Sequence, residues 1–552
     1  MRNKIPAKAG NKTHLAGVIL MNKNVLRDPF FPFLLRDGSE KVLPLSAIAD
    51  VDVVDFALPR ADFQGAVYQL AIGLLQTVFA PDDKSDWRDF YEQPPSIDEL
   101  QHAFDKAAHA FNVTGDGPLF MQDFDTLEGS KPTTISGLLI EAPGVSTLKK
   151  NIDHFVKRGI GSVMSLEMAV IALFTLQINA PSGGSGHRVG LRGGGPLTTL
   201  VLPTVDDATL WQKLWLNIIC LDVSGYDEPD LYSADVFPWL APTRLSNKPG
   251  TEIYASDVHP LHMFWAMPRR IRLIVTEAAE PCQISGVIAE QTVSEYHTKN
   301  HGGNYAGSWR HPLTPYKHNP KKPEEDNLSA KGQSLTYKVW DALTLTDDLE
   351  GQKCALVVEH FYQICDGYED VLGELPRLWV FGFDMENMDA CGWYSISMPL
   401  FAIPAEQQAD FLRPIKTLQS LASNALWHCR TQIKTAWFER PGKVKGDTSF
   451  IDLEFWQRSE AAFYKAVQQL VSQEHSTAQV LDAQFASEWL NVLRQICINL
   501  FDEYALSAGL GNQRSMEKRI QARQALTGWL FAGKDIKAFI STHKILTGKE
   551  VA

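Results

Sequence analysis

The spacing of the apolar residues changes near residue 400 of this 552-residue chain. Beyond Pro404 apolar residues recur every three or four positions, as they do from Phe485 to Tyr504, and this spacing is typical of amphipathic helices. Four stretches share the pattern and predict a helical bundle as a C-terminal domain. They lie near residues 405–436, 452–473, 479–507 and 514–541.

The residues before this point predict both strands and helices. An apolar run ending in Asp37-Gly38 predicts a strand and a turn over residues 25–38. Residues 64–80 have the i, i+3, i+4, i+7 spacing of a helix, which Pro81-Asp82 should end. Residues 82–130 are acidic and interrupted by prolines, so we expect short helices and loops on a solvated face.

A glycine-rich segment separates a predicted helix from a predicted strand. Ser165 can cap a helix over 166–178 that is apolar on almost every side and should be buried, and Leu197–Leu202 resembles a strand. A phosphate-binding loop needs the reverse order and a lysine that is missing here. Two interpretations remain: a structural turn, or a loop whose bare backbone closely approaches a ligand. Arg188 and Arg192 favour an anionic ligand.

Two further segments differ in their regularity. Residues 377–385 and 392–398 alternate as strands should, which predicts a β-hairpin with a projecting tip at 386–390. Residues 287–335 are rich in Gly, His, Pro and Lys and show weak periodicity. They predict a long, partly ordered loop.

The charge balance limits how this chain could contact a polyanion. Lysines and arginines number 52 against 65 acidic residues, a formal charge of −13, which argues against a protein that coats nucleic acid nonspecifically. Contact with nucleic acid therefore requires a local basic patch, and basic clusters occur at 149–158, 269–272 and 317–322. Residues 511–552 also carry a basic excess, which predicts nonspecific DNA contact. The residues expected to make it are Arg514, Lys518, Arg519 and Arg523.

Cysteine usage and hydropathy indicate the compartment. The seven cysteines include no C-x-x-C pair, which disfavours a zinc ribbon and a disulfide framework, and Cys391 is interpreted as a buried structural thiol. The apolar runs are too short to span a bilayer. Residues 1–21 are interpreted as a flexible basic leader and not as a signal peptide, so we expect a cytoplasmic protein without a membrane partner.

Catalytic motifs are difficult to find. There is no G-x-S-x-G elbow and no H-E-x-x-H helix. Four histidines between residues 295 and 318 leave open a stand-alone metal-dependent hydrolase as the alternative function, although their spacing matches no metal-binding helix. These histidines are His297, His301, His311 and His318.

Short strings from about residue 22 to the C-terminus form a specific pattern through their order and spacing. They are Asn24 to Phe33, Leu58-Pro59-Arg60, Pro118 to Gln122, Asp153 to Arg158, Gly190 to Gly194, Met263-Phe264-Trp265, Asn304-Tyr305, Trp309 to Leu313 and Gly382 to Met388. In these strings the chain resembles the CasA family, the large subunit of the type I-E CRISPR Cascade surveillance complex.

The resemblance implies an α+β fold, with a large mixed α/β domain over 22–402 that recognises a DNA motif and a four-helix bundle over 403–552. It implies a noncatalytic protein without a cofactor or metal, in a complex where guide RNA reads the target by base pairing. The large subunit would recognise the protospacer-adjacent motif in double-stranded DNA and help open the duplex. Its partners would be guide RNA, target DNA, the backbone, guide-end and small subunits, and a recruited helicase-nuclease.

The resemblance also implies roles for three groups of residues. A loop of Gly183, Gly184, Ser185, Gly186 and Arg188 would contact the minor groove of the motif. Asn387 and Met388 would form a wedge that separates the first base pair, where some relatives have a glutamine. A further loop would contact the guide RNA and the backbone subunits through Asn151, His154, Phe155, Lys157 and Arg158.

Overall fold

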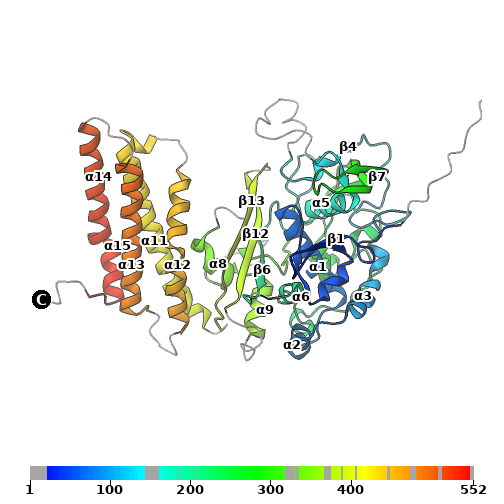
Figure 1. Ribbon diagram of the computed structural model, residues 1–552, viewed down its shortest axis with the longest axis horizontal. Helices are drawn as coiled ribbons and strands as arrows, with labels where there is room; N and C mark the ends of the chain where they lie inside the picture. Colours follow the sequence, from blue (N-terminus) through cyan, green and yellow to red (C-terminus); the bar gives the residue numbers. More distant parts are fainter. Residues whose placement is uncertain are drawn as a thin grey trace, which may run out of the picture.

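A mixed α/β region and a helical bundle make up the computed structural model, which confirms the predicted fold class. Figure 1 shows the bundle on the left, the N-terminal elements on the right, and strands β12 and β13 between them. The structure describes residues 22–142, 161–184, 186–205, 207–317, 328–329, 335–365, 375–386, 389–404, 407–443, 448–472, 480–507 and 513–546. The predicted leader over 1–21 lies outside these residues.

The N-terminal sheet is smaller than predicted. The order of its antiparallel strands is β2-β1-β3, and β1 begins only at Phe31. The predicted strand from residue 25 is wrong over its first part, because Asn24 turns the chain there: its side-chain oxygen accepts a hydrogen bond from the Leu26 amide at 3.0 Å. The strands are β1 (Phe31–Leu35), β2 (Glu40–Leu43) and β3 (Val53–Phe56).

Three helices follow, and the first confirms its prediction: α1 (Ala61–Val78) is buried along most of its length. α2 (Lys84–Glu92) begins at Asp83, and α3 (Ile97–Asp105) begins at a capping box formed by Ser96 and Glu99. The prediction of a solvated face over 82–130 is wrong in part, because both helices are amphipathic and bury aromatic residues such as Trp87 and Phe104 in the core.

The buried helix before the glycine-rich segment is confirmed as α5 (Leu166–Asn179). The Ser165 hydroxyl accepts a hydrogen bond from the Met168 amide at 3.3 Å. The chain then reaches β6 (Thr198–Leu202), which pairs with β12 (Arg377–Glu386), and β12 pairs with β13 (Asp389–Pro399). The predicted hairpin is therefore confirmed and is anchored in a three-stranded sheet.

A second hairpin replaces part of the predicted loop. β7 (Arg270–Pro281) and β8 (Ile288–Lys299) pair along their length, and the short strands β4 (Thr133–Thr134) and β5 (Met164–Ser165) also pair with β8. The loop predicted from residue 287 is wrong over this first part, because β8 is half exposed and its polar residues obscure the apolar alternation. Short elements complete the region: α6 (Leu210–Trp215), α7 (Leu221–Ser224), β9 (Tyr316–Lys317), β10 (Leu328–Ser329), α8 (Trp340–Thr344), β11 (Gln352–Lys353) and α9 (Leu356–Ile364).

The C-terminal bundle matches the four predicted stretches, although the last one is divided at Gly533. A Cβ at Gly533 would lie 2.7 Å from the carbonyl oxygen of Trp529, so the chain bends where no side chain is present. A π-helical turn over Asp502–Leu506 extends the third helix. The helices are α11 (Gln408–Trp437), α12 (Ser449–Ser472), α13 (Ala483–Phe501), α14 (Gln513–Ala532) and α15 (Lys534–Thr542).

Buried contacts join the bundle to the segment around α8. The Tyr337 ring stacks on Phe463 with centroids 4.3 Å apart, and its hydroxyl lies 2.8 Å from the Ser459 hydroxyl. Gln419 of α11 donates a hydrogen bond to Asp341 at 2.9 Å. The bundle is therefore attached to the mixed α/β region through side chains as well as through the chain near residue 402.

The structure also bears on the Cys391 thiol and on membrane-spanning helices. Cys391 is exposed, so its interpretation as a buried thiol is wrong. The residue lies near the start of β13, directly after the tip of the β12–β13 hairpin. None of the helices in the described part of the chain is both long and apolar enough to cross a membrane.

Candidate nucleic-acid interface

A tight turn forms the first part of the glycine-rich segment. The His187 amide donates to the Gly184 carbonyl at 3.2 Å, and the Gly183 amide donates to the His187 carbonyl at 3.4 Å. Gly184 and Gly186 have φ angles of +87° and +81°, a region that side chains disfavour. The free space beside the two Cα atoms differs. A Cβ at Gly184 would meet nothing within 4 Å, whereas a Cβ at Gly186 would lie 2.6 Å from the Asn300 Cβ.

Two neighbouring segments hold this turn in place. The His301 amide donates to the Gly186 carbonyl at 2.7 Å. Arg188 donates to the hydroxyl and the carbonyl of Ser246 at 2.8 and 2.6 Å. Among the residues predicted to contact the DNA motif, Arg188 is thus half-buried and fixes the loop to residue 246, while Ser185 lies outside the described residues.

Arg192 does not join this site, so its predicted role toward an anionic ligand is wrong. Its side chain is buried and donates to Thr198, Thr314 and Gln69 at 2.6 to 3.0 Å. Burial lowers the pKa of Arg192 to about 10. The guanidinium therefore stabilises the region between α1 and β6 and does not reach the surface of the loop.

The end of the glycine-rich segment contacts the β12–β13 hairpin. A Cβ at Gly195 would lie 2.5 Å from the Met385 Cγ and 2.7 Å from the Phe383 carbonyl oxygen, so only a bare backbone fits against β12. Conversely, a Cβ at Gly382 would lie 2.7 Å from the Pro196 carbonyl oxygen. The fold thus brings together the two elements that the sequence nominated separately.

The stem of this hairpin is well packed. The rings of Phe383 and Trp393 lie across the two strands with centroids 4.8 Å apart, and the Tyr394 hydroxyl donates to Asp384 at 3.1 Å. The predicted wedge residues Asn387 and Met388 lie outside the described residues. The stem therefore provides a firm base directly before that position.

The predicted guide RNA loop is outside the described residues, which include neither Asn151, His154, Phe155, Lys157 nor Arg158. The positions on either side of it are close together. A Cβ at Gly161 would lie 3.1 Å from Leu139, and the nearby Glu141 pairs with Arg60 at 2.6 Å. Residues 139 and 161 therefore lie close together in the described part of the chain.

The predicted basic patch of the last helices is used partly inside the bundle. Arg523 forms an ion pair with Asp502 through two contacts of 2.6 and 3.0 Å, and Lys518 donates to the Phe438 carbonyl at 2.6 Å. Arg519 is half-buried, and the side chain of Arg514 is outside the described residues. Two of the four predicted contacts therefore connect bundle helices to one another or to a helix end.

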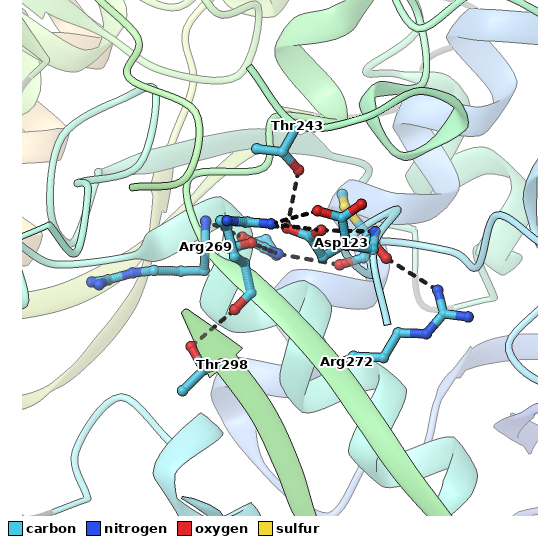
Figure 2. Close-up of polar contacts among 9 residues, drawn as sticks. Asp123, Thr243, Arg269, Arg272 and Thr298 are labelled. Atoms are coloured by element: carbon cyan, nitrogen blue, oxygen red, sulfur yellow. Dashed lines mark hydrogen bonds and ion pairs between the residues drawn. The ribbon is translucent and has the colours of Figure 1, made fainter. Parts of the chain in front are cut away.

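The basic cluster predicted at 269–272 is not a surface patch. Arg270 is 8% exposed and pairs with the fully buried Asp123 at 2.7 Å and with Asp125 at 2.9 Å. Arg272 donates to the carbonyls of Asp123 and Gly117. Figure 2 shows these polar contacts around Asp123, with Arg272 on one side and Arg269 on the other. The sequence analysis missed Asp123, whose only signal is an acidic residue two positions after the apolar run Leu119–Met121.

The histidines of the alternative hydrolase are separated. His311 is buried beside the Phe264 ring, and burial together with Arg192 lowers its pKa well below the usual value. The His297 ring accepts or donates a hydrogen bond with Ser130, and His318 is outside the described residues. Within the part of the chain that the structure describes, no three His, Cys, Asp or Glu side chains come together as metal ligands.

Comparisons with known proteins agree on one family. The family model described as CRISPR-associated protein Cse1 matches residues 24–500. The chain is similar to Thermobifida fusca Cse1, with 15% identity, a TM-score of 0.67 and coverage of 94% of this chain and 98% of that chain. It is similar to Thermus thermophilus CasA, with 17% identity, a TM-score of 0.66 and coverage of 92% and 99%. A chain of a CRISPR RNA-guided surveillance complex matches with 15% identity, a TM-score of 0.64 and coverage of 92% and 99%.

Proposed function

Because the chain belongs to the CRISPR-associated protein Cse1 family, also called CasA, we propose that it is the noncatalytic large subunit of a type I-E Cascade complex. In this role it recognises a short protospacer-adjacent motif in double-stranded DNA and helps to open the duplex beside it. Guide RNA pairing then reads the rest of the target.

The contact between the glycine-rich segment and the β12–β13 hairpin is the observation that supports this function best. Gly195 and Gly382 let the two elements approach at backbone distance. An element that binds the motif and an element that opens the adjacent base pair must lie within a few base pairs of each other. This arrangement meets that requirement.

The turn at Gly183–Gly186 suits a groove contact. The space beside Gly184 is open, so the backbone there can approach a DNA groove without steric hindrance from a side chain. The minor groove is narrow and offers few sequence-specific groups. A loop made mostly of glycine, whose Gly186 carbonyl accepts a hydrogen bond from the His301 amide, is well suited to enter it.

The tip of the hairpin is proposed to separate the strands. A wedge must occupy the space of a stacked base pair, which costs a few kcal/mol of unstacking. The packed stem at Phe383 and Trp393 resists the opposing force, and Asn387 with Met388 would insert beside the motif.

The remaining partners follow from family membership and stay proposals. They are guide RNA at the loop over residues 143–160, the backbone, guide-end and small subunits of the complex, and the helicase-nuclease that the complex recruits. The basic residues of α14 would add nonspecific DNA contact, to which Arg523 contributes less because Asp502 already pairs with it.

The proposal is tested in the assembled complex with Asn387 and Met388 both replaced by Gly. Strand opening should slow more than initial motif recognition weakens, and a target with a pre-melted bubble beside the motif should regain most of the lost binding. Cys391→Ser on the same hairpin is the matched control, because Cys391 is exposed but does not belong to the tip. Normal opening of intact duplex by the doubly substituted complex would refute the wedge, and so would a real defect that the bubble does not rescue.

A further inference from the structure

Arg269 places a positive charge beneath the glycine turn. The residue is 8% exposed, and its Nη2 donates to the Pro181 carbonyl at the start of the glycine-rich segment. A Cβ at Gly183 would lie 2.7 Å from its Nη1. The guanidinium therefore lies directly against the backbone of the turn.

The main chain of Arg269 is fixed, so this direction is built into the fold. The side chain of Gln177 accepts a hydrogen bond from the Arg269 amide and donates one to its carbonyl, both at 3.0 Å. Gln177 is itself fully buried in α5. The helix before the glycine-rich segment thus aims Arg269 at that segment.

Arg269 has no ion-pair partner among the described residues, in contrast to its neighbour. Arg270 pairs with Asp123 and Asp125, whereas the Arg269 Nε is buried without a hydrogen-bond partner. Figure 2 shows the Arg269 side chain extending away from the carboxylate of Asp123, and Arg272 lying on the far side of that carboxylate. The internal carboxylates therefore do not compensate the charge of Arg269.

An uncompensated buried charge is costly, and a ligand that pairs with it removes part of that cost. Burial lowers the pKa of Arg269 to about 10, so the group still carries its charge at neutral pH. His187 beside it adds no negative charge, and burial together with Arg269 lowers the pKa of that ring. Any anion that approaches the turn therefore meets a positive potential in a site from which much of the water is excluded.

We infer that Arg269 is a positioning residue of the motif site: its guanidinium holds the start of the glycine turn and attracts a backbone phosphate of the bound DNA to the outer surface of that turn. The inference rests on the proposed function, since it presumes that DNA lies over the turn. The ligand of Arg269 would be a phosphodiester of the DNA backbone. Such a contact contributes affinity and fixes the register of the protein on the duplex, but it does not read the base sequence.

The test uses the assembled complex and measures the affinity for a motif-containing duplex between 50 and 200 mM salt. R269Q should lower the magnitude of the slope of log K against log salt by about 0.9, the value for one lost phosphate contact. From 50 to 200 mM salt, the ratio of the unsubstituted to the R269Q affinity should therefore fall by about 3.5-fold. R269K should keep the slope. R272Q is the matched control, because it removes one charge from the same strand on the far side of Asp123, and its slope should equal that of the unsubstituted complex.

Thermal unfolding of the isolated subunit separates positioning from a structural role. R269Q should unfold at about the same temperature as the original chain, since the loss of the hydrogen bond to the Pro181 carbonyl is offset by the removal of a buried charge without an ion-pair partner. A lower unfolding temperature with an unchanged salt slope would overturn the inference. Weaker incorporation of R269Q into the complex with an unchanged slope would also overturn it and would point to a carboxylate of another subunit.

The failure of this inference can be distinguished from the failure of the proposed function. If Gly184→Val, at the open side of the turn, abolishes motif-dependent binding while R269Q keeps the full salt slope, the loop contacts DNA and only the role of Arg269 is wrong. If the unsubstituted complex binds duplexes with and without a motif equally, motif recognition itself fails.

Discussion

Alanine at Gly186 and at Gly184 should destabilise the free protein to different degrees, and both substitutions should weaken DNA binding. Both glycines have positive φ, but only Gly186 is enclosed, with Asn300 on its Cα side and the His301 amide on its carbonyl. Gly186→Ala should therefore loosen the loop in the isolated subunit. Gly184→Ala should leave the anchor intact and place a methyl group where DNA is proposed to lie.

The magnitudes follow from these two geometries. A non-glycine residue in the left-handed region costs about 1–2 kcal/mol, and this cost applies at both positions. Overpacking costs a further 1–3 kcal/mol, roughly, where a new atom meets a fixed neighbour, as it would at 2.6 Å from the Asn300 Cβ. The anchored position should thus lose about 2–5 kcal/mol of loop stability and the open position about 1–2 kcal/mol.

Hydrogen exchange of the His301 amide measures this difference directly, because that amide donates to the Gly186 carbonyl. In the isolated subunit Gly186→Ala should increase its exchange rate by about 30-fold or more, since each 1.4 kcal/mol corresponds to roughly tenfold. Gly184→Ala, with its smaller cost, should change it by less than about 30-fold. In the assembled complex both variants should weaken binding of a motif-containing duplex.

Two results would refute this reasoning. Unchanged exchange of the His301 amide in Gly186→Ala would mean that the loop accepts a side chain by a shift that the anchor tolerates. Normal target affinity of Gly184→Ala would mean that DNA does not approach the open side of the turn, and the segment would then be a structural turn only.

Three further predictions concern stability and charge. Asp123→Asn should lower the free energy of unfolding by about 3–5 kcal/mol in urea titrations, because it leaves the buried Arg270 without its main partner. Asp125→Asn should lower it by under about 1 kcal/mol, because that side chain is 61% exposed. Equal losses in the two variants would contradict the argument. Burial lowers the pKa of His262 to about 4. Between this pH and about 6.5 the unfolded chain binds a proton at His262 that the native chain does not bind. The free energy of unfolding should therefore fall by about 1.4 kcal/mol for each pH unit as the pH falls from about 6.5 toward about 4. A shallower pH dependence in His262→Gln would confirm this, and an identical dependence would exclude it. The isolated subunit, with a formal charge of −13, should bind random duplex DNA weakly and with steep salt dependence in filter-binding assays; nanomolar binding in physiological salt would show that assembly is not needed.

Periodicity alone predicted the elements that are stabilised locally. The helices α1 and α5, the β12–β13 hairpin and the bundle helices were all visible as repeats of apolar residues, because such repeats are a property of one segment and its own buried face. Predictions failed for elements in which exposed polar residues interrupt or obscure the repeat of buried apolar residues. β8 is half exposed and was expected to be a loop, and α2 and α3 carry acidic surfaces that hid their buried aromatic residues.

The sequence by itself also identified the glycine-rich segment and the hairpin as candidate DNA contacts. The glycines indicated an unusual or closely approached backbone, and the two alternating strands indicated a projecting tip. Only the tertiary structure decided that Gly195 and Gly382 bring these two segments into contact across nearly 190 residues of chain. It also decided which arginines are compensated: Arg270 meets Asp123, Arg192 meets Gln69, and Arg269 meets the glycine turn. The physical reason is that the local sequence around each arginine does not show whether its charge is paired. The electrostatic energy of that charge depends on the groups that distant segments place around it.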